Sequence, residues 1–267
     1  MLPLRAMGEA AVLYEVAGGI ATITLNRPEN RNSMTPDVMQ AFRACVACAA
    51  TDRALRAVVV TGRGTSFCAG ADFRSASPAA GEAPADHERL YATYEPFLEV
   101  FDLPMPTIAA MNGHAVGGGF GLALVCDIRI ANRAARYGAN FARLGFHSGM
   151  AISHLLPRIV GLPTAADLLF SGRLVTGEEA ESIGLVHEAV SADAVAEAAQ
   201  RRAAAIAACA PEAVRLMKRS LYAGAGWDPR GAARAESFVQ AATMRSEDAR
   251  EGIRALLEKR EPRFTGR

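Results

Sequence analysis

Two glycine-bearing turns carry residue types that could hold and activate a carbonyl group. The first is FCAGADF at 67–73, and the second is NGHAVGGG at 112–119. Each follows an apolar, strand-like run, and the second leads directly into a helix-like stretch at 120–126. Small residues let the backbone approach a ligand closely, and the first N–H groups of a helix point outward without partners. Two such turns that face each other would place two N–H donors on one carbonyl oxygen, which is the geometry of an oxyanion hole.

The two turns resemble those of the enoyl-CoA hydratase/isomerase (crotonase) superfamily. The segment LNRPENRNSM at 25–34 is similar to the family's first loop, and the tail at 246–260 is similar to its C-terminal segment. The resemblance covers nearly the whole chain in the family's order and spacing. It implies an α/β fold, a crotonase-like spiral of ββα units. It also implies an acyl thioester substrate that carries coenzyme A, with no other bound cofactor and no metal.

The resemblance assigns the oxyanion hole to the backbone N–H groups of Ala71 and Gly118. Gly118 is expected at the start of a helix, where the macrodipole favours the negative charge that develops when a thioester becomes its enolate. Losing one such donor typically raises the reaction barrier by about 3–4 kcal/mol. The alternative is that both segments are ordinary tight turns.

A larger set of residues is assigned by the same resemblance to coenzyme A or to the acyl chain. These residues are Arg31, Ser33, Ala69, Gly70, Asp72, Phe73, Val116, Gly117, Phe141 and Lys259. The first two lie in the loop that follows the nucleotide and pantetheine in the family, and those of the first turn border the adenine. Val116 lines the acyl channel, and Lys259 reaches the coenzyme A phosphates of a neighbouring subunit. Asp72 could instead only hold its turn, and Lys259 could be a solvated helix end.

The proton-transfer residues are the point at which this sequence departs from the family. Its standard hydratases use two glutamates, and these fall on Gly121 and Phe141 here. The acid of some family isomerases falls on Gly149, as does the nucleophilic aspartate of the family's aryl-CoA dehalogenases. None of these three residues can transfer a proton. We therefore expect the hydration of crotonyl-CoA by this protein to be weak.

Another residue could act as the base. His147 lies six residues beyond Phe141, in the loop that lines the family's acyl pocket, and an imidazole suits acid–base work near neutral pH. It could equally be a loop histidine that bonds to its neighbours. Tyr94 falls on the helix that borders the pocket, either as a functional phenol or as a packing residue. Asn140 could hold a water molecule or a substrate carbonyl.

Composition excludes several other classes of function. The 267 residues are 51% hydrophobic and 21% charged, which fits one globular unit with at most a small added subdomain. A net charge of +1 favours neither nucleic acid nor a membrane surface as a partner. No stretch approaches the roughly 20 apolar residues of a membrane helix, and Arg5 and Glu9 interrupt any signal-peptide pattern. Five cysteines without metal-ligand spacing favour a reducing, cytoplasmic setting.

Periodicity and turn signals predict an α/β core with parallel strands. The elements expected are a β-hairpin over 12–25, strands over 57–61, 106–110 and 127–131, helices over 37–50, 86–101 and 120–126, and a loop followed by a helix within 145–160. A capping box at 176–179, TGEE, begins a further short helix. The segment 75–84 is rich in Ala, Ser, Gly and Pro and is predicted to be a mobile loop.

Beyond about residue 190 the pattern becomes entirely helical. Helices are expected over 192–208, 211–223, 229–243 and 248–261, so we divide the chain into a core at 1–190 and a C-terminal helical region at 191–267. Apolar stripes on such helices are usually packed against something. The resemblance implies trimers, commonly paired into hexamers, with this region at the subunit contacts. A helical cap on a monomer is the alternative.

Two functions of different classes are compatible with these observations. The first is an acyl-CoA enzyme of the enoyl-CoA hydratase/isomerase type, a lyase or isomerase, that stabilises a thioester enolate and uses an atypical base. The second is a protein that binds acyl-CoA without turnover. A thioester hydrolase or a retro-aldol lyase is a third possibility. Phe120, Phe141 and Phe146 suggest an apolar acyl pocket, but the sequence does not identify the acyl group.

Overall fold

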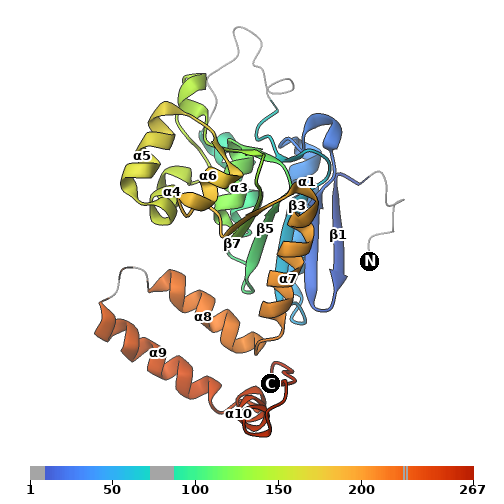
Figure 1. The fold of residues 1–267 in the computed structure, drawn as a ribbon, viewed down its shortest axis with the longest axis vertical. Coiled ribbons are helices and arrows are strands. Elements are labelled where there is room, and N and C mark those ends of the chain that lie inside the picture. The colour runs from blue at the N-terminus through green and yellow to red at the C-terminus, as the bar shows by residue number, and fades with distance from the viewer. Residues whose placement is uncertain (1–9, 73–86, 225, 227) are drawn as a thin grey trace.

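The computed structural model of the protein describes residues 10–72, 87–224, 226 and 228–267 (Figure 1). Phe73, expected to contact coenzyme A, and the loop expected over 75–84 both lie outside the described residues. The C-terminus lies beside α10 at the far end of the molecule (Figure 1).

A six-stranded sheet forms the centre of the core. Its strands, in spatial order, are β1 (Val12–Ala17), β2 (Ile20–Leu25), β3 (Ala57–Gly62), β5 (Thr107–Met111), β7 (Ile128–Asn132) and β10 (Glu188–Val190). The first two pair as an antiparallel hairpin around Gly18 and Gly19, and each later pair is parallel. Near-continuous runs of buried apolar residues in β3 and β5 are typical of strands covered on both faces. The predicted parallel α/β core is confirmed.

A second, four-stranded sheet carries the two glycine turns. It is made of β4 (Ser66–Cys68), β6 (His114–Val116), β8 (Arg136–Gly138) and β9 (Val175–Thr176). The first three strands run parallel, and β8 pairs with β9 antiparallel. We did not predict these strands, since each is at most three residues long and too short to show an alternating pattern.

Helices cover both faces of the central sheet. On one face lie α1 (Pro36–Thr51), α2 (His87–Leu98) and α3 (Gly118–Val125), which contribute Phe42, Phe97 and Leu122 to the main core. On the other face lies α7 (Val195–Ala207), whose Ala199 and Ala203 pack with residues of β3, β5 and β7. Neighbouring residues of a strand point to opposite faces, so Val58 and Val60 join the first layer whereas Ala57 and Val59 join the second.

The segment after β8 holds three short helices that flank the first layer. These are α4 (Ile152–Val160), α5 (Leu162–Ser171) and α6 (Gly177–Ser182). The capping box works as predicted, since Thr176 Oγ1 accepts the N–H of Glu179 at 3.1 Å. We did not predict α5. It begins directly after Gly161, with Pro163 in its first turn.

The last three helices extend from one end of the core (Figure 1). They are α8 (Pro211–Ala223), α9 (Pro229–Thr243) and α10 (Glu247–Glu258), with 3-10 turns elsewhere at Pro28–Asn30, Phe141–Leu144 and Ala192–Ala194. The helix expected over 248–261 is shorter, because Lys259 adopts a left-handed conformation (φ 54°) that ends it. The division of the chain at residue 190 stays a prediction, and the helix that follows it, α7, packs on the sheet.

Candidate functional site

The two glycine turns lie against each other. Gly70 has a left-handed φ of 85°, and a Cβ atom built on it would lie 3.0 Å from the backbone nitrogen of Gly118 and 2.7 Å from the carbonyl oxygen of Val116. Both the backbone conformation and the space therefore require glycine at position 70. The carbonyl oxygen of Gly70 accepts the N–H of Met34 at 2.8 Å, which ties the first turn to the segment before α1.

Parallel pairing of β4 with β6 brings the turns together. Ser66 pairs with His114 at the start of the ladder, and the turns follow at the ends of the two strands. Side chains at Gly113 and Gly119 would overlap the carbonyl groups of Thr65 and Cys68. The glycines of the second turn thus allow the backbones of the two segments to approach closely.

The amide groups of Ala71 and Gly118 are available at this junction. Gly118 is the first residue of α3, and the first hydrogen bond of that helix runs from the N–H of Gly121 to the carbonyl of Gly117 at 3.0 Å. The N–H of Gly118 therefore has no acceptor within its own helix. Among the residues that the structure describes, neither this N–H nor that of Ala71 has a hydrogen-bond partner. Gly118 is buried and Ala71 is exposed.

Met150 occupies the space beside Gly121. A Cβ atom built on Gly121 would overlap the Met150 Cβ and lie 3.0 Å from its Cγ. Met150 is 1% exposed, and it and Ala151 both adopt left-handed conformations, with φ of 58° and 53°, in the turn that leads to α4. A carboxylate at position 121 would therefore require Met150 to move. Sequence reasoning missed Met150, because no local pattern places it next to α3.

Tyr94 lies directly over Gly149. A Cβ atom built on Gly149 would lie 2.9 Å from Cζ of Tyr94 and 3.0 Å from its phenolic oxygen. Tyr94 is half-buried and comes from α2, whereas Gly149 comes immediately before Met150 in the turn before α4. The structure thus brings the phenol to the position at which some relatives are expected to carry an acid.

Phe141 and Asn140 border the second turn. A Cβ atom built on Gly117 would lie 3.6 Å from Cζ of Phe141 and 3.9 Å from Oδ1 of Asn140. The Phe141 ring also packs edge-on against Phe146, with centroids 5.5 Å apart. This side of the junction therefore combines an aromatic ring with a neutral amide.

His147 lies on the exposed side of the same loop. Its Nδ1 is 2.7 Å from the carbonyl oxygen of Ser148. A carbonyl oxygen only accepts, so Nδ1 carries the proton and Nε2 of the neutral ring is an acceptor. Within the described residues, His147 makes no hydrogen bond to either glycine turn.

The loop expected to follow coenzyme A runs beside the first turn. The carbonyl of Arg31 accepts the N–H of Ala69 at 3.1 Å, while Arg31 itself is exposed. The buried Ser33 donates from Oγ to the carbonyl of Asn30 at 2.6 Å. The buried Asn32 amide donates to the carbonyl of Ser66 at 2.8 Å and so fixes the loop to β4. Sequence reasoning missed this role of Asn32.

Two further assigned residues have different positions. Asp72 is half-buried at the end of the first turn, directly before the residues that the structure does not describe. Lys259 is exposed at the end of α10, which lies far from α3 in the molecule (Figure 1). Within one chain, Lys259 is therefore not brought to the glycine turns.

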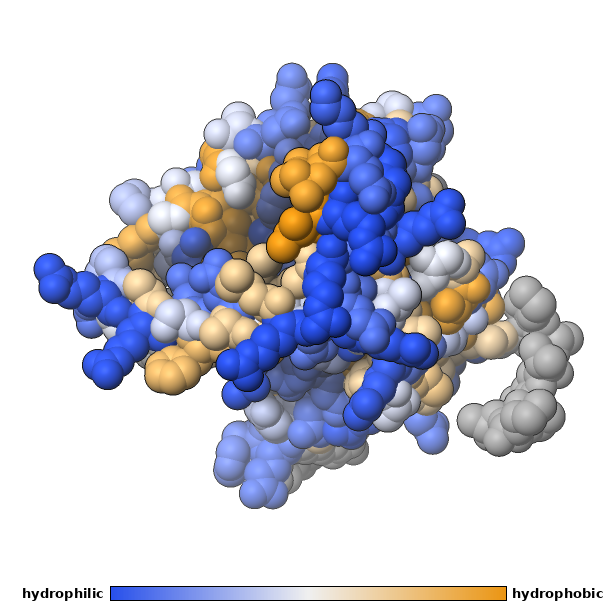
Figure 2. Space-filling view, turned by 90° about the horizontal axis from the view of Figure 1, so that it is seen from below, coloured by the Kyte–Doolittle hydropathy of each residue, from blue (hydrophilic) through white to orange (hydrophobic). Residues whose placement is uncertain are grey.

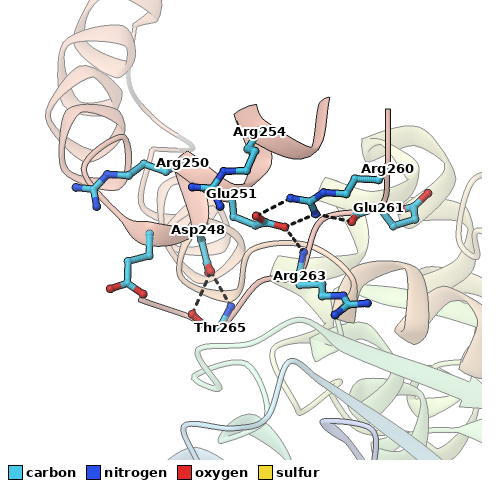
Figure 3. Close-up of a pocket in the computed structure, with 9 residues that line it drawn as sticks. Asp248, Arg250, Glu251, Arg254, Arg260, Glu261, Arg263 and Thr265 are labelled. Carbon is cyan, nitrogen blue, oxygen red and sulfur yellow. Dashed lines mark hydrogen bonds and ion pairs between the residues drawn. The ribbon is translucent and has the colours of Figure 1, made fainter. Parts of the chain in front are cut away.

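A charged cavity of about 860 Å³ lies between α10 and the C-terminal tail (Figure 3). Glu251 accepts two bonds from Arg260, at 2.6 and 3.0 Å, and one from the N–H of Arg263 at 3.0 Å. Its hydrogen bonds to Arg260 lower the pKa of the Glu251 carboxyl to about 2. Asp248 accepts the N–H of Thr265 at 2.7 Å. These carboxylates hold the tail along α10 and are thus engaged in structural contacts.

The described part of the chain has neither a metal site nor a membrane-spanning helix. No group of three His, Cys, Asp or Glu side chains there could hold a metal ion. No helix in the described ranges is long and apolar enough to cross a membrane.

Comparison with known proteins assigns the chain to a family. The sequence model of the Enoyl-CoA hydratase/isomerase family matches residues 15–267. The chain belongs to this family. It is 38% identical, over 249 residues, to a Thermus thermophilus protein provisionally named an enoyl-CoA hydratase, covering 92% of this chain and 98% of that protein. It is 34% identical, over 260 residues, to the (E)-benzylidenesuccinyl-CoA hydratase of Thauera aromatica, covering 96% of this chain and 99% of that enzyme.

Solved structures of this family share the fold of the whole chain. The enoyl-CoA hydratase of Bacillus anthracis superposes with a TM-score of 0.89 at 30% identity, covering 96% of this chain and 100% of that one. The enoyl-CoA hydratase of Mycobacterium smegmatis superposes with a TM-score of 0.87 at 30% identity, covering 96% of this chain and 99% of that one. The predicted crotonase-like fold and the predicted class, an acyl-CoA-processing enzyme of the hydratase/isomerase type, are confirmed.

Proposed function

We propose that this protein stabilises the enolate of an acyl-CoA thioester between the N–H groups of Ala71 and Gly118. The observation that carries the proposal is the contact between the two glycine turns, in which Gly70 lies against the nitrogen of Gly118. Both amides lack other hydrogen-bond partners among the described residues. The thioester oxygen would accept both N–H groups as its charge grows, and α3 would add its favourable dipole.

The substrate would enter along the loop that holds Arg31 and Ser33. Their neighbours in the first turn, Ala69, Gly70 and Asp72, would border the nucleotide, and the acyl chain would pass Val116, Gly117 and Phe141. Lys259 would come from a neighbouring subunit, which agrees with its place at the far end of its own chain (Figure 1). In this arrangement coenzyme A is part of the substrate and no metal takes part in the reaction.

Classical hydration should be weak under this proposal. Adding water to a 2-enoyl thioester needs one group to activate the water and another to deliver a proton at the α-carbon. Gly121 and Phe141 provide neither, and Met150 fills the space beside the first of them. An isomerase or lyase reaction that starts from the enolate needs fewer proton-transfer groups in such a site.

The test is a panel of acyl-CoA thioesters, scored for a thermal shift of the protein and for products by mass. The panel should include crotonyl-CoA and an aryl-substituted enoyl-CoA, because a similar enzyme is named for (E)-benzylidenesuccinyl-CoA. Product with an unchanged mass but a moved double bond supports an isomerase. Free coenzyme A or a shortened acyl chain identifies a hydrolase or a retro-aldol lyase.

Two results of that panel would contradict the proposal. Turnover of crotonyl-CoA at the rate of ordinary hydratases would show that Gly121 and Phe141 had been misinterpreted. A thermal shift with no product for any thioester would favour the second function, a protein that binds acyl-CoA without turnover.

We further propose that the chain assembles as a trimer or as a pair of trimers through α8, α9 and α10, in the cytoplasm. Large apolar side chains are exposed along these helices, namely Met217, Leu221, Phe238, Met244, Ile253, Leu256 and Leu257. The view from their side shows hydrophobic groups on the surface next to strongly hydrophilic ones (Figure 2). All five cysteines are free thiols, which suits a reducing compartment.

A further inference from the structure

We infer that the phenol of Tyr94 carries the proton to and from the α-carbon of the bound thioester. This inference rests on the proposed function, since it needs an enolate held by Ala71 and Gly118. It goes further by selecting one proton carrier among the polar side chains near the turns and by stating what that side chain does.

A chain of neighbouring residues connects Tyr94 to α3, the helix that begins at Gly118. Met150 packs on Gly121, in the first turn of α3, and Gly149 directly precedes Met150. The phenolic oxygen of Tyr94 would lie 3.0 Å from a Cβ atom built on Gly149, closer than real Cβ contacts usually come. The phenol thus occupies the space that a short carboxylate at position 149 would need. The glycine leaves room for it.

The helix that carries Tyr94 is held firmly. The next residues of α2 anchor it to α1, since Phe97 packs edge-on against Phe42 with centroids 4.8 Å apart. Arg43 of α1 pairs with Glu95 at 2.8 Å and with Glu99 at 2.6 Å. A proton carrier on a braced helix keeps its distance from a substrate better than one on an exposed loop.

The other polar groups near the turns fit this role less well. His147 is exposed on its loop, and its Nδ1 is bonded to the carbonyl of Ser148. The amide of Asn140 does not give up or take a proton at the pH of the cell. Tyr94 combines partial burial, a rigid support and a group that both donates and accepts.

The proposed step balances without any further reagent. Solvent removes the phenolic proton, and the phenolate oxygen then takes the proton from the α-carbon. The C–H electron pair becomes the C=C bond of the enolate, and the carbonyl π pair moves onto the oxygen held by the two amides. In the reverse direction the phenol returns its proton to the α-carbon, and the carbonyl reforms.

Exchange of the α-proton in D₂O tests the inference directly, because it needs no knowledge of the final product. The protein is incubated with butyryl-CoA, and deuterium in the acyl chain is followed by mass. Tyr94→Phe keeps the ring on Gly149 and removes only the hydroxyl, so it should slow exchange by roughly 10²–10⁴-fold. The matched control is Tyr91→Phe on the exposed face of the same helix, which should exchange as the unaltered protein does.

Two further measurements separate a chemical role from a structural one. Tyr94→Phe should keep the thermal shift that butyryl-CoA gives the unaltered protein while its exchange falls, because only the hydroxyl is removed. The double variant Tyr94→Ala with Gly149→Asp places a carboxylate in the vacated space and should exchange faster than Tyr94→Ala alone. Rescue by a group of different shape supports proton transfer as the role of Tyr94.

Several outcomes would overturn the inference. If exchange survives Tyr94→Phe but is lost in His147→Gln, then the proton carrier is His147 and the proposed function still stands. If the unaltered protein gains a thermal shift from butyryl-CoA but shows no exchange, then Tyr94 carries no proton and only binding remains. If it shows neither a shift nor exchange with any thioester of the panel, the proposed function fails as well.

Discussion

Gly121 and Gly149 do not leave empty space at the site. Met150 fills the volume beside the first, and the ring of Tyr94 fills the volume beside the second. Empty space in a core is destabilising, so a chain that lacks two side chains must place others there or collapse around the gap. Met150 and Tyr94 thus lie beside two positions at which the family resemblance predicts carboxylates.

Removing the N–H of Ala71 tests the oxyanion hole at the scale of a single atom. Ala71→Pro should lower turnover of the best thioester by roughly 10²–10³-fold, because one of two donors to the developing oxyanion is lost. Ala71→Gly keeps the N–H and should stay close to the unaltered protein, since the Ala71 side chain is exposed. Thermal melts of both variants check the fold. Equal turnover by Ala71→Pro and Ala71→Gly would remove this amide from the site.

Restoring a glutamate at position 121 should not by itself restore hydration. Gly121→Glu forces its Cβ into Met150, and such overpacking typically costs about 1–3 kcal/mol of stability. Adding Met150→Gly frees the space and suits the left-handed backbone at position 150. The double variant should hydrate crotonyl-CoA faster than Gly121→Glu alone, with Met150→Gly as the control. A single Gly121→Glu variant with high hydratase activity would contradict this packing argument.

At the scale of the elements, a buried ion pair attaches α8 to the core. Lys218 of α8 lies 2.8 Å from Asp127, and their side chains are only 9% and 14% exposed. The Asp127 carboxylate also accepts the N–H and hydroxyl of Thr107 at 2.7 and 2.9 Å, and the hydroxyl of Tyr222 at 2.6 Å. Burial, followed by the bond to Asp127, raises the pKa of the Tyr222 phenol. This cluster joins α8 to Thr107 at the start of β5 and to Asp127 just before β7.

Lys218→Met should destabilise the fold strongly. It leaves the Asp127 carboxylate buried without its cation, which typically costs about 3–5 kcal/mol of unfolding free energy. Adding Asp127→Asn removes that charge and should recover part of the loss. Urea unfolding measures the stability of the single and the double variant. Arg201→Met provides the comparison, because the ion pair of Arg201 with Glu197 is exposed and is worth at most about 1 kcal/mol. Similar losses of unfolding free energy for Lys218→Met and Arg201→Met would show that the cluster around Asp127 does not attach α8 to the core.

At the scale of the whole molecule, the core and the last three helices differ in how they are packed. The central sheet is covered on both faces, whereas α8 and α9 contain no fully buried residue. Helices with exposed leucine, methionine and phenylalanine side chains gain most of their stability from packing against other elements. In a single chain these helices have apolar faces left to cover, and other copies of the chain could cover them.

Leu257→Glu should break the proposed assembly. Leu257 is 78% exposed in the single chain, and a charge there would be buried without a partner at a subunit contact. Light scattering after size exclusion should give a multiple of three of the 28.1 kDa chain for the unaltered protein and a smaller mass for the variant. Val16→Glu, at an exposed position on β1 and outside these helices, is the control. A single-chain mass for the unaltered protein would instead indicate a monomer with a helical cap.

Features that depend on neighbours in the chain were predictable from the sequence by itself. The hairpin around Gly18 and Gly19, the capping box at Thr176 and the helix that begins at the glycine triplet all rest on local hydrogen bonds and on the period of apolar residues. The resemblance added the order of the two turns and thus the family. The structure and the comparisons confirm the parallel core and the family membership.

Contacts between distant segments were decided only by the tertiary structure. No pattern in the sequence places Met150 beside Gly121, Tyr94 over Gly149 or Lys218 beside Asp127, because each pair joins elements far apart in the chain. The short strands β4, β6, β8 and β9 likewise exist through their pairing with one another rather than through their own composition. Local propensity determines which segments are helix or strand, but close packing of the whole core determines which side chains meet at the site.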